Sequence, residues 1–198
     1  MSKWDHLNPT GAQLARTSVP DMDGLLGLQF PVLDHGFVRV VDYMGSDASI
    51  VQAARVSYGS GTSKKRTDEQ LVRYLIRHWH LSPLEMCEVK LHVKLPIFVA
   101  RHWIRHRTAN INEISGRYSV LEKEFYLPTE QDFNLQDTEG RQGRGEETLS
   151  AEDTALVLTK MKAEALDVFQ NYEHYSTLGL SREVSRINLP LSTYTQWY

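Results

Sequence analysis

The chain has 198 residues, of which 41% are hydrophobic and 24% are charged, and its formal net charge is −3. This composition is typical of one globular domain and excludes an intrinsically disordered chain. The slightly acidic balance gives no global attraction to nucleic acid, so a site for an anionic ligand has to be local.

Signals for targeting are missing from the sequence. Residues 1–20 contain no apolar core flanked by basic residues, as a secretory signal would. No apolar run approaches the roughly 20 residues that span a bilayer. We therefore expect a cytoplasmic protein with no membrane partner. Cys87 is the single cysteine, which excludes an intrachain disulfide and is typical of a small buried hydrophobe.

The first third of the chain predicts an arm, a strand and a helix. Residues 1–33 combine proline, glycine and polar residues with little periodicity, which predicts an N-terminal arm. The segment 36–43 is predicted to be a strand. Ser46 and Asp47 are good N-caps, and the apolar spacing after them predicts a helix to about Ser57.

Capping signals organise the middle of the chain. Thr67 and Gln70 have the spacing of a capping box, which predicts a second helix. Ser82 is predicted to cap a short helix that follows it. Residues 87–95 alternate apolar and polar, as a half-buried strand does, and Pro96 opens a third helix with the sequence IFVARHWIRHR.

The last third of the chain predicts a strand, an exposed insertion and two helices. Residues 120–127 alternate well enough for a strand, and residues 129–150 are expected to form an exposed insertion. Ser150 begins a long helix to about Tyr175, and Ser181 begins a short one. The pattern as a whole predicts an α+β fold, a mostly antiparallel sheet packed with helices, in a single domain over residues 34–198.

The end of the third helix is unusually basic, with five side chains in seven positions: Arg101, His102, Arg105, His106 and Arg107. Helical spacing places Arg101 and Arg105 on one face of the helix, and His102 and His106 on another. The helix dipole favours cations there by only roughly 0.3–1 kcal/mol each, which accounts for one or two of them. Such a cluster indicates an anionic ligand, and phosphate matches arginine well.

A polar run follows directly: Asn110, Asn112, Glu113, Ser115, Gly116, Arg117, Tyr118 and Ser119. Donors, a few acceptors and an aromatic ring suit a nucleotide, and a glycine permits close ligand approach. Alternatives remain open. The two histidines could bind a metal, although flanking arginines disfavour it. The arginines could form a nucleic-acid patch, which the net charge disfavours. Ser115 could be a nucleophile, although a hydroxyl that contacts phosphate or backbone is commoner.

These residues resemble the signature of the flavin-dependent thymidylate synthases, R-H-R, seven residues, then S. Arg105, His106, Arg107 and Ser115 fit it, and the wider Asn-Glu-x-Ser-x-Arg pattern fits at 112–117. Further blocks in the family's order are GFVRVVDYMG, AARVSYG, HWHLSPLE, HVKLPIFVARHW, EFYLP and REVSRINLPLSTYT. The resemblance covers roughly residues 33–198.

The resemblance implies a methyltransferase that makes dTMP from dUMP. Methylenetetrahydrofolate would supply the carbon, and FAD reduced by NADPH would supply the hydride. It also implies a homotetramer with shared active sites and no nucleic-acid partner. Carried over by position, the flavin ligands would be Ser57, Ser82, Arg105, His106, Arg107 and Glu113. The dUMP ligands would be His102, Arg105, Glu113, Ser115, Gly116, Arg117 and Arg186.

The sequence departs from the family pattern in three places. His102 stands where some members have glutamine, and Ser82 stands where threonine is also seen. Members of the family continue past the position of Tyr198 with a segment that carries the uracil-activating arginine. The expectation is therefore a chain truncated at the C-terminus, with no catalytic residue of its own and no metal. Two rival hypotheses are a non-catalytic nucleotide- or RNA-binding protein and an inactive truncated family member.

Overall fold

The computed structural model describes residues 15–56, 66–138, 140 and 143–198. It divides into two compact units. The first unit combines Met1–Gly27 with Val40–Lys90, and the second combines Leu28–Arg39 with Leu91–Tyr198. Each unit is described by itself below.

The first unit holds α1 (Pro20–Asp23), the end of β2 (Gly36–Met44), α2 (Asp47–Arg55), α3 (Asp68–Arg77) and the 3-10 helix η2 (Ser82–Met86). Its core is a cluster of four buried aliphatic residues, Ile50, Val51, Leu71 and Leu75. Cys87 packs against this cluster, and its thiol donates to the carbonyl of Ser46 at 3.3 Å. The cysteine is therefore a packing residue, as predicted, and burial raises the pKa of its thiol.

The capping signals of the first unit were confirmed at two of three positions. Ser46 caps α2, and Thr67 and Gln70 form a reciprocal capping box on α3. The cap predicted at Ser82 is wrong. The N-cap of η2 is Leu81, whose carbonyl accepts from Leu84 at 2.8 Å, so the turn closes one residue earlier and Ser82 lies inside the helix.

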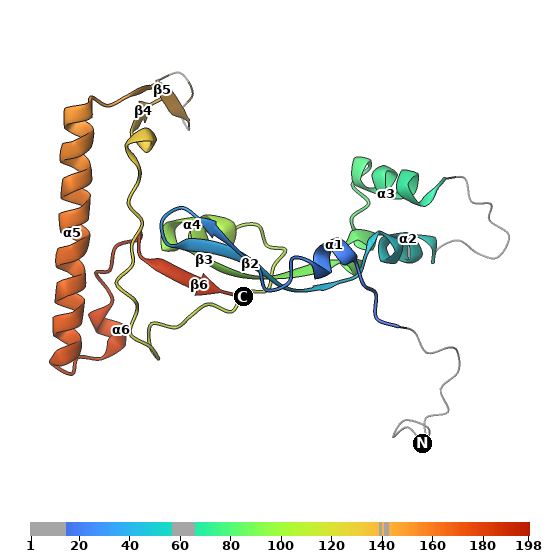
Figure 1. Cartoon of the computed structure of the whole chain (residues 1–198), viewed down its shortest axis with the longest axis horizontal. Helices are drawn as coiled ribbons and strands as arrows, with labels where there is room; N and C mark the ends of the chain where they lie inside the picture. Colours follow the sequence, from blue (N-terminus) through green and yellow to red (C-terminus); the bar gives the residue numbers. More distant parts are fainter. Residues whose placement is uncertain (1–14, 57–65, 139, 141–142) are drawn as a thin grey trace. The chain divides into compact units, whose positions relative to one another are not determined.

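The second unit contains β1 (Gln29–Val32), the start of β2, most of β3 (Glu88–Pro96), α4 (Ile97–Trp103), η3 (Glu130–Asp132), β4 (Asn134–Gln136), β5 (Arg144–Thr148), α5 (Ala151–Thr177), α6 (Arg182–Ser185) and β6 (Tyr194–Trp197). One sheet has the strand order β1-β2-β3-β6, and β4 and β5 form a separate hairpin (Figure 1). Strands β1 and β2 pair antiparallel, as do β3 and β6. The predicted α+β fold with a mostly antiparallel sheet is confirmed.

Alternation along β3 builds the core of the second unit. Val93 and Leu95 are 2% and 5% exposed, and they cluster with Ala100 of α4 and Trp197 of β6. Helix α5 buries Phe169 completely. The apolar faces of a strand pair and of helices thus meet as the sequence pattern requires.

Two predictions in the second unit need correction. Residues 120–127 form no strand, only an isolated bridge between Phe125 and Thr193. Around this bridge, the amides of Tyr194 and Tyr126 donate to the carbonyls of Glu124 and Ser192 at 3.0 and 2.9 Å. The predicted insertion 129–150 is not wholly exposed, since it forms the β4–β5 hairpin and buries Phe133.

The predicted arm also has structure, because α1 and β1 both lie within its described part, residues 15–33. The boundary at residue 34 stays a prediction. No helix in the described ranges is long and apolar enough to cross a membrane.

Candidate functional site

Helix α4 ends at Trp103, not after the basic run that follows it. The amides of Arg105 and His106 donate to the carbonyls three residues earlier at 3.2 and 3.0 Å, which tightens the chain beyond α-helical geometry. The predicted helix through Arg107 is therefore wrong, and so are the predicted shared faces of the two arginines and of the two histidines. The second half of the basic cluster lies in a turn.

The basic residues remain available to a ligand. All five are exposed: Arg101, His102, Arg105, His106 and Arg107. Within the described residues, none of them forms an ion pair. Their charges are therefore not neutralised by the fold, which is the arrangement that an anion-binding surface requires.

Glu113 lies on a segment that pairs with β6. It forms an antiparallel bridge with Trp197, and Asn112 and Tyr198 exchange two backbone hydrogen bonds at 2.9 and 3.1 Å. The carboxylate is exposed, and its Oε1 accepts from the hydroxyl of Thr195 at 2.6 Å. An exposed carboxylate with one oxygen held in place can accept a further hydrogen bond from a ligand.

A tight turn over Ser115–Tyr118 follows. The amide of Arg117 donates to Ser115 Oγ at 3.3 Å, and the amide of Tyr118 donates to the carbonyl of Ser115 at 3.1 Å. Gly116 is buried, and a Cβ added there would lie 3.0 Å from Nη1 of Arg186. A side chain at this position would require Arg186 or Leu121 to shift by a few tenths of an ångström. The structure therefore brings Gly116 and Arg186 together, although 70 positions separate them in the sequence.

Helix α6 supplies further contacts to the same turn. Nη1 of Arg182 donates to the carbonyl of Tyr118 at 2.7 Å, and Nη2 of Arg117 lies 3.7 Å from Oε2 of Glu183. Arg186 follows α6 and is half-buried. The turn and α6 together concentrate three guanidinium groups and one carboxylate, which suits a phosphate that several donors would hold.

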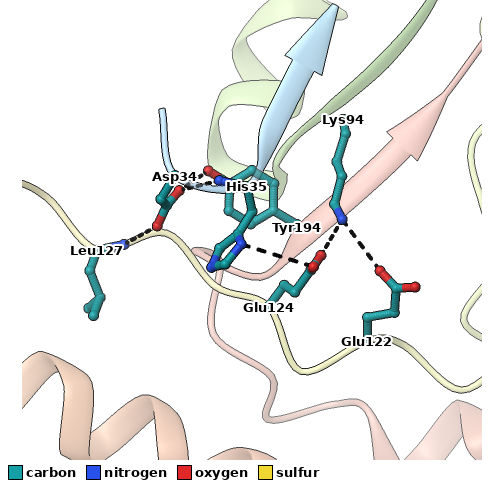
Figure 2. Close-up of polar contacts among 7 residues, drawn as sticks. All are labelled: Asp34, His35, Lys94, Glu122, Glu124, Leu127 and Tyr194. Carbon is teal, nitrogen blue, oxygen red and sulfur yellow. Dashed lines mark hydrogen bonds and ion pairs between the residues drawn. The ribbon is translucent and has the colours of Figure 1, made fainter. Parts of the chain in front are cut away.

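A polar network joins β3, β6 and Asp34 to the segment that follows the turn (Figure 2). The hydroxyl of Tyr194 donates to Asp34, and the Nζ of Lys94 contacts Glu124 and lies 3.4 Å from Glu122. The Lys94 side chain is only 11% exposed. The sequence did not indicate this network, because nothing in a single strand pattern shows which loop carboxylates will face it.

The pKa values in this network move in the directions that favour the observed pairs. Burial alone would raise the pKa of the Asp34 carboxyl, but hydrogen bonds from Tyr194 and from backbone amides bring it below its usual value. Burial and the bond to Asp34 raise the pKa of the Tyr194 hydroxyl. Burial would lower the pKa of Lys94, yet Glu124 and Glu122 hold it above its usual value. The fold thus keeps the aspartate and lysine charged and the tyrosine neutral.

Two predicted ligands are not among the described residues of the second unit. Ser82 is exposed and belongs to η2 in the first unit. Ser57 lies outside the described residues. Of the predicted ligands, the second unit therefore contains the basic run, Glu113, the Ser115–Arg117 turn and Arg186.

The sequence analysis also missed a feature of the first unit. Helix α3 ends in a Schellman motif, in which Trp79 donates to Ile76 and His80 donates to Leu75, at 3.2 and 2.9 Å. The left-handed position of this motif is occupied by Trp79, with φ of 56° and 80% exposure. A non-glycine residue there costs about 1–2 kcal/mol.

Known proteins share these features. A family model described as Thy1, thymidylate synthase complementing protein, matches residues 39–198. The flavin-dependent thymidylate synthase of Ruegeria pomeroyi is 55% identical over 197 residues, which cover 98% of this chain and 64% of the relative. The enzyme of the same name from Gluconobacter oxydans is 54% identical over 187 residues, which cover 93% of this chain and 61% of the relative. The chain thus spans 61–64% of the length of these curated relatives.

Solved structures agree on the fold. The crystal structure of a UMP/dUMP methylase PolB from Streptomyces cacaoi, bound with 5-Br UMP, superposes with a TM-score of 0.70 at 35% identity. That match covers 84% of this chain and 70% of the other. A second structure of that methylase, bound with 5-Br dUMP, gives a TM-score of 0.70 at 33% identity, covering 83% of this chain and 72% of the other.

Proposed function

Because the chain belongs to the Thy1 family of thymidylate synthase complementing proteins, we propose that it functions in the flavin-dependent conversion of dUMP to dTMP. Methylenetetrahydrofolate is the proposed carbon donor, and NADPH is the proposed reductant of FAD. Relatives that are more than 50% identical carry the name of this activity, and a structural neighbour is a UMP/dUMP methylase.

The observation that carries the proposal is the contact between Gly116 and Arg186. The half-buried guanidinium of Arg186 lies against the turn at Gly116, and Arg117 follows in the same turn. Ser115 begins the turn, and its Oγ accepts from the amide of Arg117, so its hydroxyl proton can still be donated to a ligand. Two arginines and a hydroxyl around one turn match the acceptors of a nucleotide monophosphate. In this proposal the dUMP phosphate binds here, and Glu113 accepts from an N–H or O–H of the nucleotide.

The chain also fits FAD, by the chemistry of its exposed donors. Arg105, His106 and Arg107 have no ion-pair partner among the described residues, and they match the diphosphate of this cofactor. When bound, the flavin would supply the hydride for the reaction. The protein's task is to hold the nucleotide and the cofactor in register and to bind their negative charges.

Several finer statements belong to the same proposal. Ser82 and Ser57 are further proposed flavin ligands, and His102 and Arg105 are further proposed dUMP ligands. As the resemblance to the family implies, we also propose that the complete site is shared between subunits of a homotetramer. The proposed compartment is the cytoplasm, and the proposed catalytic domain covers residues 34–198.

Ligand binding by the purified chain tests this proposal. We expect the fluorescence of FAD to be quenched when the chain is titrated into it. In calorimetry, we expect dUMP to bind with a stoichiometry of one per chain. Release of tritium from dUMP labelled at C5 then tests turnover. If the chain binds neither FAD nor dUMP, the proposal is contradicted. Tight binding of single-stranded RNA without dUMP binding would instead favour a nucleic-acid-binding protein that uses the exposed arginines.

A further inference from the structure

We propose that Thr195 is a positioning residue that fixes the carboxylate of Glu113 for nucleotide binding. This inference rests on the proposed function, since it assigns the Glu113 carboxylate to the dUMP site. Thr195 is 4% exposed and does not face solvent, so it acts through Glu113 and not on the ligand itself.

The hydrogen bond between the two residues is short and well directed. Oγ1 of Thr195 donates to Oε1 of Glu113 at 2.6 Å, although 82 positions separate the residues in the sequence. Threonine is β-branched and stiff at χ1, so its hydroxyl keeps one direction. A hydrogen bond to an ionised carboxylate is also stronger than one between neutral groups.

The donor is anchored by the sheet and by the network of Figure 2. Thr195 pairs with Leu95 in the antiparallel β3–β6 register. Its neighbour Tyr194 donates its hydroxyl to Asp34 and its amide to the carbonyl of Glu124, the latter at 3.0 Å. Successive strand residues point to opposite faces, so Tyr194 fixes one face of the strand while Thr195 serves the other.

The backbone of the acceptor is anchored to the same strand. The amide of Ile114 donates to the carbonyl of Gln196 at 2.8 Å, next to the bridge between Glu113 and Trp197. Both ends of the side-chain hydrogen bond thus belong to one rigid element. An exposed glutamate otherwise samples several rotamers, and binding has to select one of them. Here Oε1 is occupied, and Oε2 stays available for an N–H or O–H of the nucleotide.

A purely structural role for Thr195 predicts different behaviour, and the chain offers a matched control for it. Thr193 lies two positions earlier, is 0% exposed, and its Oγ1 has no hydrogen-bond partner in the described structure. A buried hydroxyl in this segment is therefore tolerated without a partner. Thr193→Val removes an equivalent group that contacts no ligand residue, whereas Thr195→Val removes the donor to Glu113.

The test measures dUMP affinity by calorimetry and the order of the Glu113 side chain by NMR relaxation. Thr195→Val should weaken dUMP binding by up to roughly tenfold, because binding then has to order a Glu113 side chain that the threonine no longer holds in place. It should also lower the order of the Glu113 methylenes in the absence of ligand. Thr195→Ser should restore binding to within about twofold of the parent chain, and Thr193→Val should change neither quantity.

A double-mutant cycle with Glu113→Ala separates positioning from stability. If Thr195 acts through the carboxylate, Thr195→Val should add no further loss of dUMP affinity in the Glu113→Ala background. An equal loss in both backgrounds, or unchanged order at Glu113, would overturn the positioning role. If the parent chain binds no dUMP but Thr195→Val still lowers the order at Glu113, the proposed function fails and the contact stands without its nucleotide assignment.

Discussion

The two halves of the signature behave differently in the structure. The run Arg105–Arg107 is exposed and has no ion-pair partner within the described residues. The turn Ser115–Arg117 is closed by its own hydrogen bonds and packed against Arg186. One continuous motif therefore contains an exposed set of basic side chains and a preformed turn.

The difference has a physical meaning for binding. A preformed turn loses little conformational freedom when a ligand binds, so its contacts appear almost fully in the affinity. Exposed arginines with no partner lose more freedom, and their interaction with an anion is screened by salt. We therefore expect mutations in the first half to change ligand binding alone, and mutations in the second half to change stability as well.

The largest effect is expected for Arg105→Ala. Removing this guanidinium should weaken both FAD and dUMP binding by roughly 1.5–3 kcal/mol, the usual size of a charged hydrogen-bonded contact. The free energy of unfolding should change by less than about 0.5 kcal/mol, because the side chain has no partner to lose. Calorimetry and urea unfolding measure the two quantities.

A matched control for this variant is Arg73→Ala. Arg73 is an exposed arginine that pairs only with Glu69, at 2.7 Å on the same helix. It should leave both affinities unchanged. Unchanged affinity in Arg105→Ala would remove Arg105 from both ligand sites.

The second half is tested by Gly116→Ala. The added Cβ would lie 3.0 Å from Arg186 Nη1 and 3.2 Å from Leu121 Cδ1. Moving both neighbours should lower the free energy of unfolding by about 1–2 kcal/mol and should weaken dUMP binding several-fold. Gly24→Ala is the control, since its Cβ would meet nothing closer than 3.5 Å. If the Gly116→Ala variant keeps full dUMP affinity, Arg186 is not a ligand of the dUMP phosphate.

The network behind the second half should make its stability depend on pH. Hydrogen bonds lower the pKa of Asp34 from the ordinary 3.8, so its contribution is present above pH 3.8 and is lost as the pH falls through the lowered pKa. Tyr194→Phe should cost about 1 kcal/mol at neutral pH. It should also flatten the acid limb, because Asp34 loses one of the bonds that lower its pKa. Urea unfolding from pH 2 to pH 7 measures both effects, and an unchanged acid limb would contradict the assignment.

The contrast between the halves also shows what could be predicted from the sequence. Local signals succeeded where local physics decides. Alternation placed β3, and the caps at Ser46, Thr67 and Ser150 began helices where predicted. The helix predicted through Arg107 was wrong, because the amides of Arg105 and His106 form 3-10 hydrogen bonds after Trp103 and the α-helix ends there.

Contacts between distant segments lay beyond a single sequence. The motif indicated Glu113 and Gly116 as ligands, but no spacing rule relates them to Thr195 or Arg186. The alternation at 120–127 predicted a strand, yet its pairing with the segment before β6 is limited to the isolated bridge between Phe125 and Thr193. Pairing partners are set by the fold, and pattern alone shows only that a segment could pair.

The smallest expected effect tests Glu183, a carboxylate of α6 that lies near Arg117 of the turn. Arg117 and Glu183 lie 3.7 Å apart with 56% and 63% of their side chains exposed. Such an exposed pair contributes roughly 0–0.5 kcal/mol to stability, so Glu183→Gln should leave the unfolding transition nearly unchanged.

The effect of Glu183→Gln on dUMP affinity should have the opposite sign to the effects of Arg105→Ala and Gly116→Ala. Removing a negative charge beside the proposed phosphate site should tighten dUMP binding about twofold at low salt. This gain in affinity should disappear near 0.5 M salt, where charges are screened within roughly 4 Å. Glu173→Gln is the control, because Glu173 pairs with Lys123 at 3.8 Å and not with the turn. Weaker dUMP binding in Glu183→Gln would show that the ion pair orients Arg117 for the phosphate. In that case the proposed phosphate site would depend on Glu183. The hydrogen bonds within the turn would then not be enough to preform the site.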